Sequence, residues 1–281
     1  MGRGFHVPAS IDDTLVEQRI LEQATIVPGA AITGWASLRW HGANLCTGLA
    51  GDGRTPIAVP LTGPQQTRPG PGFRHRRTTI PPAELVVRHG LLCTTPLRAA
   101  ADAMCDAATL VDAVIIGDIA CSAGLVSLPD LRHHLTQRSR TPGLTRARTA
   151  VGLVSARVRS PGETRLRLIW RLDAGLPEPL CNWPILDLDG RWLGAPDLWC
   201  PRLGIYAEYD GAGHRTREEQ ATDASRDTLF ADMGLEGLRV VGTDIANVDR
   251  VVSRIRSAIT RAATSQRPRL YRPGDRPRPL V

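Results

Sequence analysis

Three acidic residues lie close together between Pro196 and His214, and their types and spacing could support metal chemistry. The segment is predicted to form two short strands joined by a turn, with Asp197 on the first strand and Glu208 and Asp210 on the second. Since side chains alternate along a strand, Glu208 and Asp210 leave the same face of it. Carboxylates held this close raise each other's pKa unless a cation lies between them. A divalent metal ion is the simplest such cation, and in a basic protein it indicates phosphodiester chemistry.

These acids also have ordinary structural explanations. Asp197 follows a proline and, taken singly, fits a turn residue. Glu208 fits such an explanation less well, because a charged residue inside an apolar strand needs a partner. Glu163 ends the segment Ser-Pro-Gly-Glu, which is a capping box in which the carboxylate reaches back to the Ser160 amide. The alternative makes Glu163 a third acid near the metal, and the spacing favours the cap.

A histidine and an arginine follow the acidic segment. His214 comes after Gly-Ala-Gly, which lets the backbone turn sharply and point the ring back at the carboxylates, although a loop histidine is more often merely exposed to solvent. Arg226 either forms a local ion pair with Asp223, three residues earlier on a helix, or faces the site and contacts a phosphate.

The charge of the chain favours a polyanionic partner. The 281 residues carry a net charge of +7, and all 35 basic residues are arginine. Nucleic acid is the expected partner. Because arginine does not lose its proton near neutral pH, any general base must be a histidine or a carboxylate.

Arginines are concentrated between Leu128 and Arg171, a segment that contains ten arginines and only two acidic residues. On helices they would form a basic band that leads to the acidic segment. We expect this band to track phosphates, and the alternative is a solvated helix face. The residues nearest the acids, and therefore the expected nucleic-acid contacts, are Arg157, Arg159, Arg165 and Arg167.

The cysteine pattern and the apolar runs point to a cytoplasmic protein. The six cysteines show no Cys-x-x-Cys pair and no zinc-site spacing. The N-terminal residues lack the apolar core of a signal peptide. The most apolar stretch, 107–126, contains Asp112 and Asp118 and is expected to be a buried helix rather than a membrane span.

Helix starts and alternating apolar runs divide the chain into five segments. We expect a loose N-terminus over 1–12, an α+β domain over 13–126, an arginine-rich helical connector over 127–157, an α/β domain over 158–262 and a disordered basic tail over 263–281. Helices are predicted over 96–106, 110–122, 128–137, 142–156 and 161–174. Residues 176–260 then predict strands near 180–188, 191–199 and 204–210, a helix after 216, a strand over 237–242 and a last helix.

The acidic segment and its neighbours resemble the PD-(D/E)XK nuclease superfamily. The motifs are Ser-Pro-x-Glu-Thr, Pro-Asp, Glu-x-Asp-Gly-x-x-His and Asp-x-x-Arg, in that order, over residues 158–262. Within the superfamily they look most like the domain of unknown function related to very-short-patch-repair (Vsr-like) endonucleases. The resemblance implies a restriction-endonuclease-like mixed sheet flanked by helices, in an α/β fold.

The same resemblance implies a set of site residues. Mg²⁺ or Mn²⁺ would be bound by Asp197, Glu208 and the carbonyl of Tyr209, with Glu163 as the acid on the helix. The chain departs from the superfamily pattern at Asp210, which stands where a lysine is usual. In the repair-endonuclease branch a histidine takes over, so His214 would transfer the proton.

The N-terminal part resembles a second family. Ile-Thr-Gly-Trp-Ala-Ser-Leu-Arg-Trp-His-Gly at 32–42 and Thr-Thr-Pro-Leu-Arg-Ala-Ala-Ala-Asp at 94–102 look like AbiEi-type antitoxins of type IV toxin–antitoxin systems, over about 15–125. The alternative explanation of Trp35 and Trp40 is that both are core aromatic residues.

Two functions are therefore expected. The first is a metal-dependent endonuclease, with DNA as the expected substrate, in a context of DNA repair, defence or toxin–antitoxin action. In it Arg226 would stabilise the pentacoordinate phosphate. The alternative is a non-catalytic DNA-binding antitoxin or regulatory protein with a degenerate nuclease fold. A homodimer or a toxin partner is compatible with both.

Overall fold

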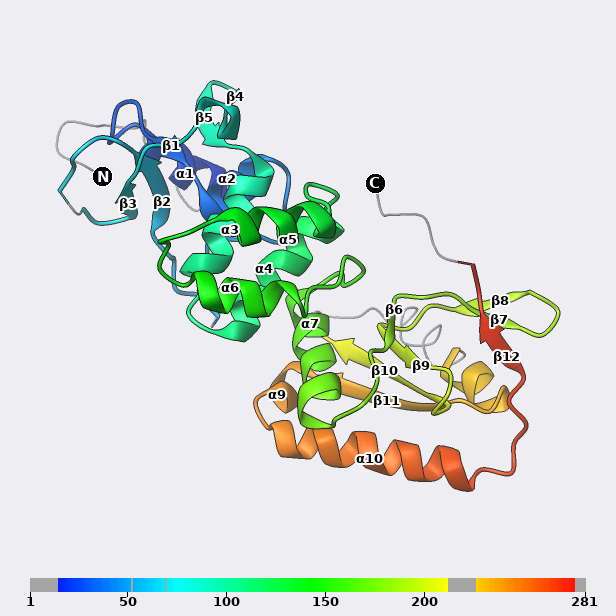
Figure 1. Cartoon of the computed structure of the whole chain (residues 1–281). Helices are drawn as coiled ribbons and strands as arrows, with labels where there is room; N and C mark the ends of the chain where they lie inside the picture. Colours follow the sequence, from blue (N-terminus) through cyan, green and yellow to red (C-terminus); the bar gives the residue numbers. More distant parts are fainter. Residues whose placement is uncertain (1–14, 52, 69, 212–225, 276–281) are drawn as a thin grey trace. The chain divides into compact units, whose positions relative to one another are not determined.

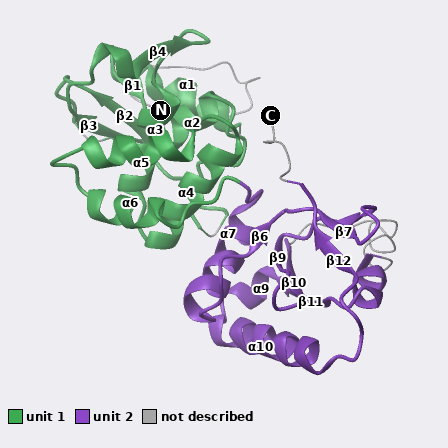
Figure 2. Cartoon of the chain, turned by 45° about the vertical axis from the view of Figure 1, so that its right-hand side comes forward, with its two compact units in different colours: residues 1–156, 280–281 green, residues 157–279 purple. Residues whose placement is uncertain are grey.

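The chain folds into two compact units that divide after Ala156 (Figures 1 and 2). The computed structural model describes residues 15–51, 53–68, 70–211 and 226–275. The first unit comprises residues 1–156 together with 280–281, and the second comprises 157–279. Both combine helices with mixed sheets, so the expected α/β class is confirmed.

A five-stranded sheet forms the framework of the first unit, with strand order β3-β2-β1-β5-β4. The strands are β1 (Ala31–Ile32), β2 (Val59–Gly63), β3 (Phe73–Arg77), β4 (Leu85–Arg88) and β5 (Leu91–Thr94). β4 and β5 form a hairpin, preceded by the short 3-10 helix η1 (Pro82–Glu84). β1 pairs antiparallel with β2 and parallel with β5, and β2 pairs parallel with β3. β3 and β4 are therefore the edge strands.

Helices accompany this sheet in the part of the unit that the structure describes. They are α1 (Val16–Ala24), α2 (Gly34–Trp40), α3 (Pro96–Asp106), α4 (Leu110–Ser122), α5 (Leu128–Gln137) and α6 (Leu144–Val151). The predicted bounds of α3, α4 and α5 are confirmed. α6 is shorter than predicted at both ends: it begins two residues later, after Gly143 with its left-handed φ of 76°, and it ends at Val151 instead of 156.

Helices α5 and α6 do not form a separate connector. Both pack against α3, and Leu131, Leu135 and Ala147 are fully buried, so the arginine-rich segment belongs to the first unit.

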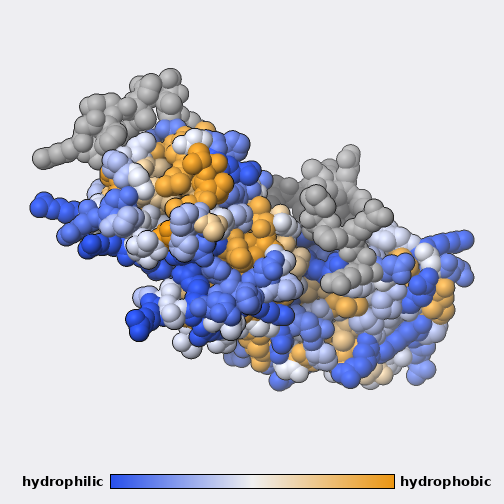
Figure 3. Space-filling view, turned by 45° about the horizontal axis from the view of Figure 1, so that its top comes forward, coloured by the Kyte–Doolittle hydropathy of each residue, from blue (hydrophilic) through white to orange (hydrophobic). Residues whose placement is uncertain are grey.

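Trp35 is buried, as its core explanation predicts, whereas Trp40 is half-buried and donates from Nε1 to the carbonyl of Arg88. Figure 3 shows hydrophobic residues gathered on one part of this unit's surface.

The second unit is built on a four-stranded sheet with order β11-β10-β9-β6. Its strands are β6 (Leu180–Cys181), β9 (Leu198–Cys200), β10 (Ile205–Asp210) and β11 (Glu236–Val241). β6, β9 and β10 are antiparallel neighbours, while β10 and β11 run parallel. A parallel pair needs a crossover, and the described part of the helix between them covers 226–232.

Helices cover one face of this sheet (Figure 1). α7 (Pro161–Leu168) continues into the π-helix η2 (Ile169–Asp173), and α9 (Gly242–Ile245) leads into α10 (Val248–Thr264). Trp170, Ile205, Ala207 and Ile255 lie in the core between the helices and the sheet. On the other face, Trp199 and Tyr206 pack with Phe230. The alternation along β10 therefore directs Glu208 to the face away from α10.

Two of the predicted long strands are each divided between two sheets. The segment 180–188 contains β6 and then β7 (Ile185–Asp187), and 191–199 contains β8 (Trp192–Gly194) and the start of β9. The break after β6 falls at Asn182, whose φ of 47° ends regular strand geometry. β7 and β8 join a separate three-stranded sheet with order β12-β7-β8.

The prediction of a disordered tail from 263 is wrong for the residues that the structure describes, which reach 275. α10 continues to Thr264, and β12 (Tyr271–Pro273) pairs antiparallel with β7. Tyr271 is buried and packs edge-on against the Trp199 ring, with 6.0 Å between the two ring centres. The tail is ordered because one aromatic side chain completes the core on the far face of the sheet. None of the described helices has the length and apolar character needed to cross a membrane.

Candidate functional site

The pairing of β9 with β10 brings Asp197 next to Glu208. Leu198 lies opposite Ala207 in this antiparallel register, so the next pair along is Asp197 and Glu208. The Tyr209 amide donates to Asp197 Oδ2 at 2.8 Å, which fixes the carboxylate against β10. The predicted convergence of these two acids on adjacent strands is what the structure shows.

The surroundings of Asp197 strongly favour the protonated form of its carboxyl group. Burial raises its pKa from 3.8 to about 7, and the neighbouring negative charges of Glu163 and Glu208 act in the same direction. The Tyr209 amide and the positive charge of Arg159 oppose this and do not offset it. Near neutral pH the ionised form of Asp197 is therefore poorly stabilised by its surroundings.

Glu163 takes part in the α7 cap through its amide and in this site through its carboxylate. Ser160 Oγ accepts from the Glu163 amide at 3.1 Å, which confirms the cap at the start of α7. The reciprocal half of the box is replaced, because the Glu163 carboxylate points elsewhere. Its Oε2 accepts from the Arg159 amide at 2.9 Å and from Asn182 Nδ2 at 2.8 Å. Asn182 was not predicted, because only the fold brings residue 182 to the start of α7.

Close packing holds α7 against β10 at this point. A Cβ atom on Gly162 would lie 2.0 Å from Cε1 of Tyr209, so only glycine allows the ring to lie on the first turn of the helix. This contact positions Glu163 beside the end of β10, where Asp197 also lies.

Glu208 has arginine partners. Arg226 Nη2 donates to both of its carboxylate oxygens, at 2.7 and 2.8 Å, and Arg239 Nη2 lies 3.5 Å from Oε2. Arg239 stands directly across from Glu208 in the β10–β11 register. Arg226 therefore faces the site, as one of its two interpretations predicts, and there it binds the carboxylate. Asp223 and His214 lie outside the described residues.

Asp210 is part of the same charge network. Asp210 Oδ2 lies 3.9 Å from Arg239 Nη1, and Arg239 Nη2 lies 3.3 Å from Asp227 Oδ2. Tyr206 donates its hydroxyl proton to Asp227 Oδ1 at 2.9 Å. The role of Arg239 was missed, and only the pairing of β11 with β10 could have revealed it.

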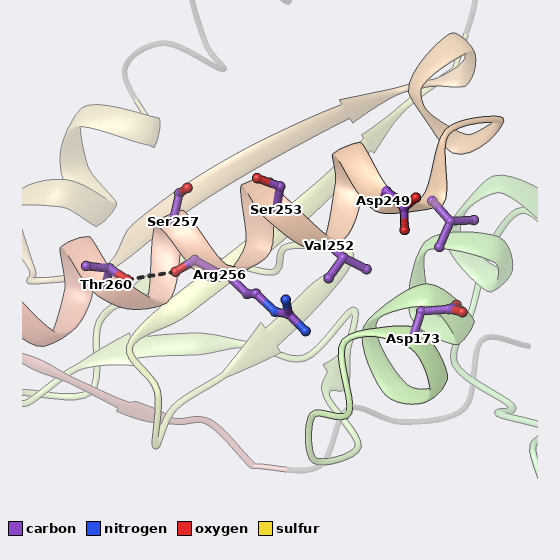
Figure 4. A pocket seen from close by; sticks show the side chains of 8 residues that line it. Asp173, Asp249, Val252, Ser253, Arg256, Ser257 and Thr260 are labelled. Carbon is purple, nitrogen blue, oxygen red and sulfur yellow. Dashed lines mark hydrogen bonds between the residues drawn. The ribbon is translucent and has the colours of Figure 1, made fainter.

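Two surface hollows of this unit differ in their relation to the site. The smaller one has a volume of about 250 Å³ and is lined by Glu208, Asp227 and Arg239 among others. The larger one, about 510 Å³, lies along α10 beside Asp173, with Ser253 and Arg256 in its wall (Figure 4). Only the smaller hollow is lined by Glu208, since α10 covers the opposite face of the sheet.

The four arginines predicted to contact nucleic acid differ in their surroundings. Arg167 is fully buried and donates from Nη1 to Glu178 Oε1 at 3.0 Å, so it cannot contact nucleic acid and that prediction is wrong. The guanidinium of Arg157 lies 4.7 Å from the centre of the Trp183 ring. Arg159 is exposed and Arg165 is half-buried, and both stay candidates.

The donors of the site fit a hard divalent cation only in part. No group of three potential ligands close enough to hold a metal ion occurs among the residues that the structure describes. Asp197 offers an oxygen donor whose charge is poorly compensated, and the Tyr209 carbonyl is a donor of the same kind. Glu208 can join them only if it gives up Arg226. Asp197 and the Tyr209 carbonyl are therefore compatible with a cation, whereas the Glu208 carboxylate is bound by Arg226.

Comparison with protein-family models, with curated proteins and with solved structures found no match to this chain.

Proposed function

We propose that the second unit is a metal-dependent nucleic-acid phosphodiesterase, endonuclease-like, with DNA as its substrate. The observation that carries the proposal is Asp197, whose pKa is raised to about 7 because it is buried beside Glu163 and Glu208. Such clustered charge costs folding free energy and is typical of sites that bind a cation or transfer protons. The resemblance of residues 158–262 to PD-(D/E)XK nucleases supports the same conclusion.

In this proposal Asp197, Glu208 and the Tyr209 carbonyl hold the metal. Bound Mg²⁺ or Mn²⁺ would supply a water of lowered pKa and would neutralise charge on the phosphate. The Tyr209 amide fixes the orientation of Asp197, and Asn182 with the Arg159 amide fixes Glu163. Arg226 lies close enough to exchange its carboxylate partner for a phosphate oxygen, for which its planar fork is suited.

The role of His214 in proton transfer stays a prediction, as do a cytoplasmic location and a homodimer or toxin partner. DNA repair, defence and toxin–antitoxin action are the contexts in which such an activity would be used.

The test is cleavage of plasmid and single-stranded DNA in the presence of Mg²⁺ or Mn²⁺. We expect cleavage by the wild type, loss of cleavage in Asp197→Asn and in Glu208→Gln, and retention in Asp189→Asn, which removes an exposed carboxylate in the β7–β8 turn. Calorimetric titration with Mg²⁺ should show binding that Asp197→Asn removes. Equal cleavage by the wild type and the two site variants, or none by any of them, would contradict the proposal.

The arginine contacts of Glu208 favour a second candidate function. A carboxylate already neutralised by Arg226 needs no metal, which fits a DNA-binding regulatory protein with a degenerate nuclease fold. This candidate predicts salt-sensitive DNA binding in EDTA that persists in the Asp197→Asn/Glu208→Gln double variant. Loss of binding on removal of metal would exclude it.

A further inference from the structure

An edge strand of the first unit carries a dense run of cations. β3 reads Phe-Arg-His-Arg-Arg and lies at one edge of the five-stranded sheet. The opposite edge strand, β4, reads Leu-Val-Val-Arg and exposes Val86 and Val87 beside its single arginine. The two edges of one sheet are thus chemically different, and the basic edge has no role in the site described above.

Two arginines of β3 share a single carboxylate. Arg74 Nη2 pairs with Asp106 Oδ2, and Arg76 Nη2 pairs with Asp106 Oδ1, at the last residue of α3. The two arginines are two residues apart, so they leave the same face of the strand. Asp106 offsets one of their two charges and holds both guanidinium groups in place.

A third arginine approaches the same helix end from α6. Arg146 Nη2 donates to the carbonyl of Cys105, the residue before Asp106, at 3.3 Å. Its Nε is buried and has no hydrogen-bond partner among the described residues. We call Arg74, Arg76, Arg146 and Asp106 the β3 cluster, which carries a net charge of +2.

The β3 cluster is accessible and preorganised. The side chains of Arg74 and Arg76 are 55% and 32% exposed, whereas that of Asp106 is 15% exposed. A guanidinium has five N–H donors, and each of these ion pairs uses a single nitrogen, so donors remain for a second anion. Because Asp106 already holds the side chains in place, an incoming anion meets a smaller cost in side-chain entropy.

We propose that the β3 cluster is a second nucleic-acid-binding site, which takes the phosphate backbone without reading the bases. Guanidinium groups at alternate positions of an exposed edge strand suit consecutive phosphates of one strand, and binding of this kind comes from charge and counterion release. The site shares with the proposed function only its nucleic-acid partner and needs neither metal nor cleavage.

The test measures the fluorescence anisotropy of a labelled DNA duplex that is titrated with the protein. The titration is done in EDTA and repeated over a range of salt concentrations. Each arginine that contacts a phosphate contributes about 0.9 to the slope of log K against log salt, so Arg74→Gln/Arg76→Gln should lower that slope by about 1.8. At about 0.1 M salt this corresponds to a roughly sixtyfold weaker affinity. Arg88→Gln/Arg256→Gln removes the same formal charge from exposed positions outside the cluster and should change the slope less.

Two further variants separate charge from folding. Arg74→Lys/Arg76→Lys keeps both charges and should keep binding. Arg74→Gln/Arg76→Gln/Asp106→Asn also removes the Asp106 carboxylate, which the double variant leaves unpaired. This triple variant should bind DNA as weakly as the Gln double variant. Equal affinity and slope for wild type and the Gln double variant would overturn the proposal, as would equal losses in the control variant. If DNA is bound through the β3 cluster but never cleaved, the proposed function fails and this site stands.

Discussion

Replacing Asp197 by asparagine should stabilise the second unit at neutral and alkaline pH, even though it removes a central residue of the candidate site. The pKa of this carboxyl is raised from 3.8 to about 7 by burial and by the charges of Glu163 and Glu208. At about 1.4 kcal/mol per pH unit, the ionised form costs the folded state about 4 kcal/mol. In Asp197→Asn the new side chain carries no such charge, and its amide oxygen can still accept from the Tyr209 amide.

The sign of the effect follows from the direction of the pKa change. Below about pH 4 Asp197 is protonated in both the folded and the unfolded state, so the variant and the wild type should have similar free energies of unfolding. Between about pH 4 and pH 7 the unfolded chain loses this proton while the folded one keeps it, and the contribution of Asp197 to stability falls. Above about pH 7 the variant should be more stable by about 4 kcal/mol.

Urea denaturation followed by tryptophan fluorescence measures this difference, since four of the six tryptophans lie in the second unit. Asp189→Asn is the matched control, which keeps Asp197, and its free energy of unfolding should follow that of the wild type across the pH range. Above pH 7, Mg²⁺ should reduce the difference in free energy of unfolding between Asp197→Asn and the wild type. An ion that binds only the folded wild type stabilises it by about 2.7 kcal/mol at a hundred times its Kd. A variant that is less stable than the wild type at every pH would refute the reasoning.

Three other substitutions test the parts that position the site. Gly162→Ala should lower stability by about 1–3 kcal/mol, measured by urea denaturation, because the new methyl group would overlap the Tyr209 ring; an unchanged midpoint would contradict this close approach. Ser160→Ala should cost about 1 kcal/mol through loss of the α7 cap, and Ser160→Thr is the control that keeps the hydroxyl. Tyr271→Ala should cost about 3 kcal/mol in thermal unfolding, because it empties the contact with Trp199, whereas Tyr271→Phe should keep most of the stability.

Local signals in the sequence were sufficient for most helices. The pairs Thr95-Pro96 and Ser160-Pro161 mark the starts of α3 and α7, and Ser127 marks the start of α5, because a hydroxyl or a proline acts within one turn. The strands of the second unit were predicted less well. Whether a strand continues or moves to another sheet depends on pairing partners distant in the sequence, as at Asn182 and at β12.

The sequence by itself indicated that Asp197 and Glu208 lie together, because a tight turn between two apolar strands favours their pairing as antiparallel neighbours. It also determined the Ser160 cap at the start of α7, which depends on residues within one turn. Only the tertiary structure decided which charges those acids meet. The register of β10 with β11 places Arg239 opposite Glu208, and the crossover helix directs Arg226 onto the same carboxylate. These contacts join segments separated by 18 and 31 residues, and no local pattern specifies them.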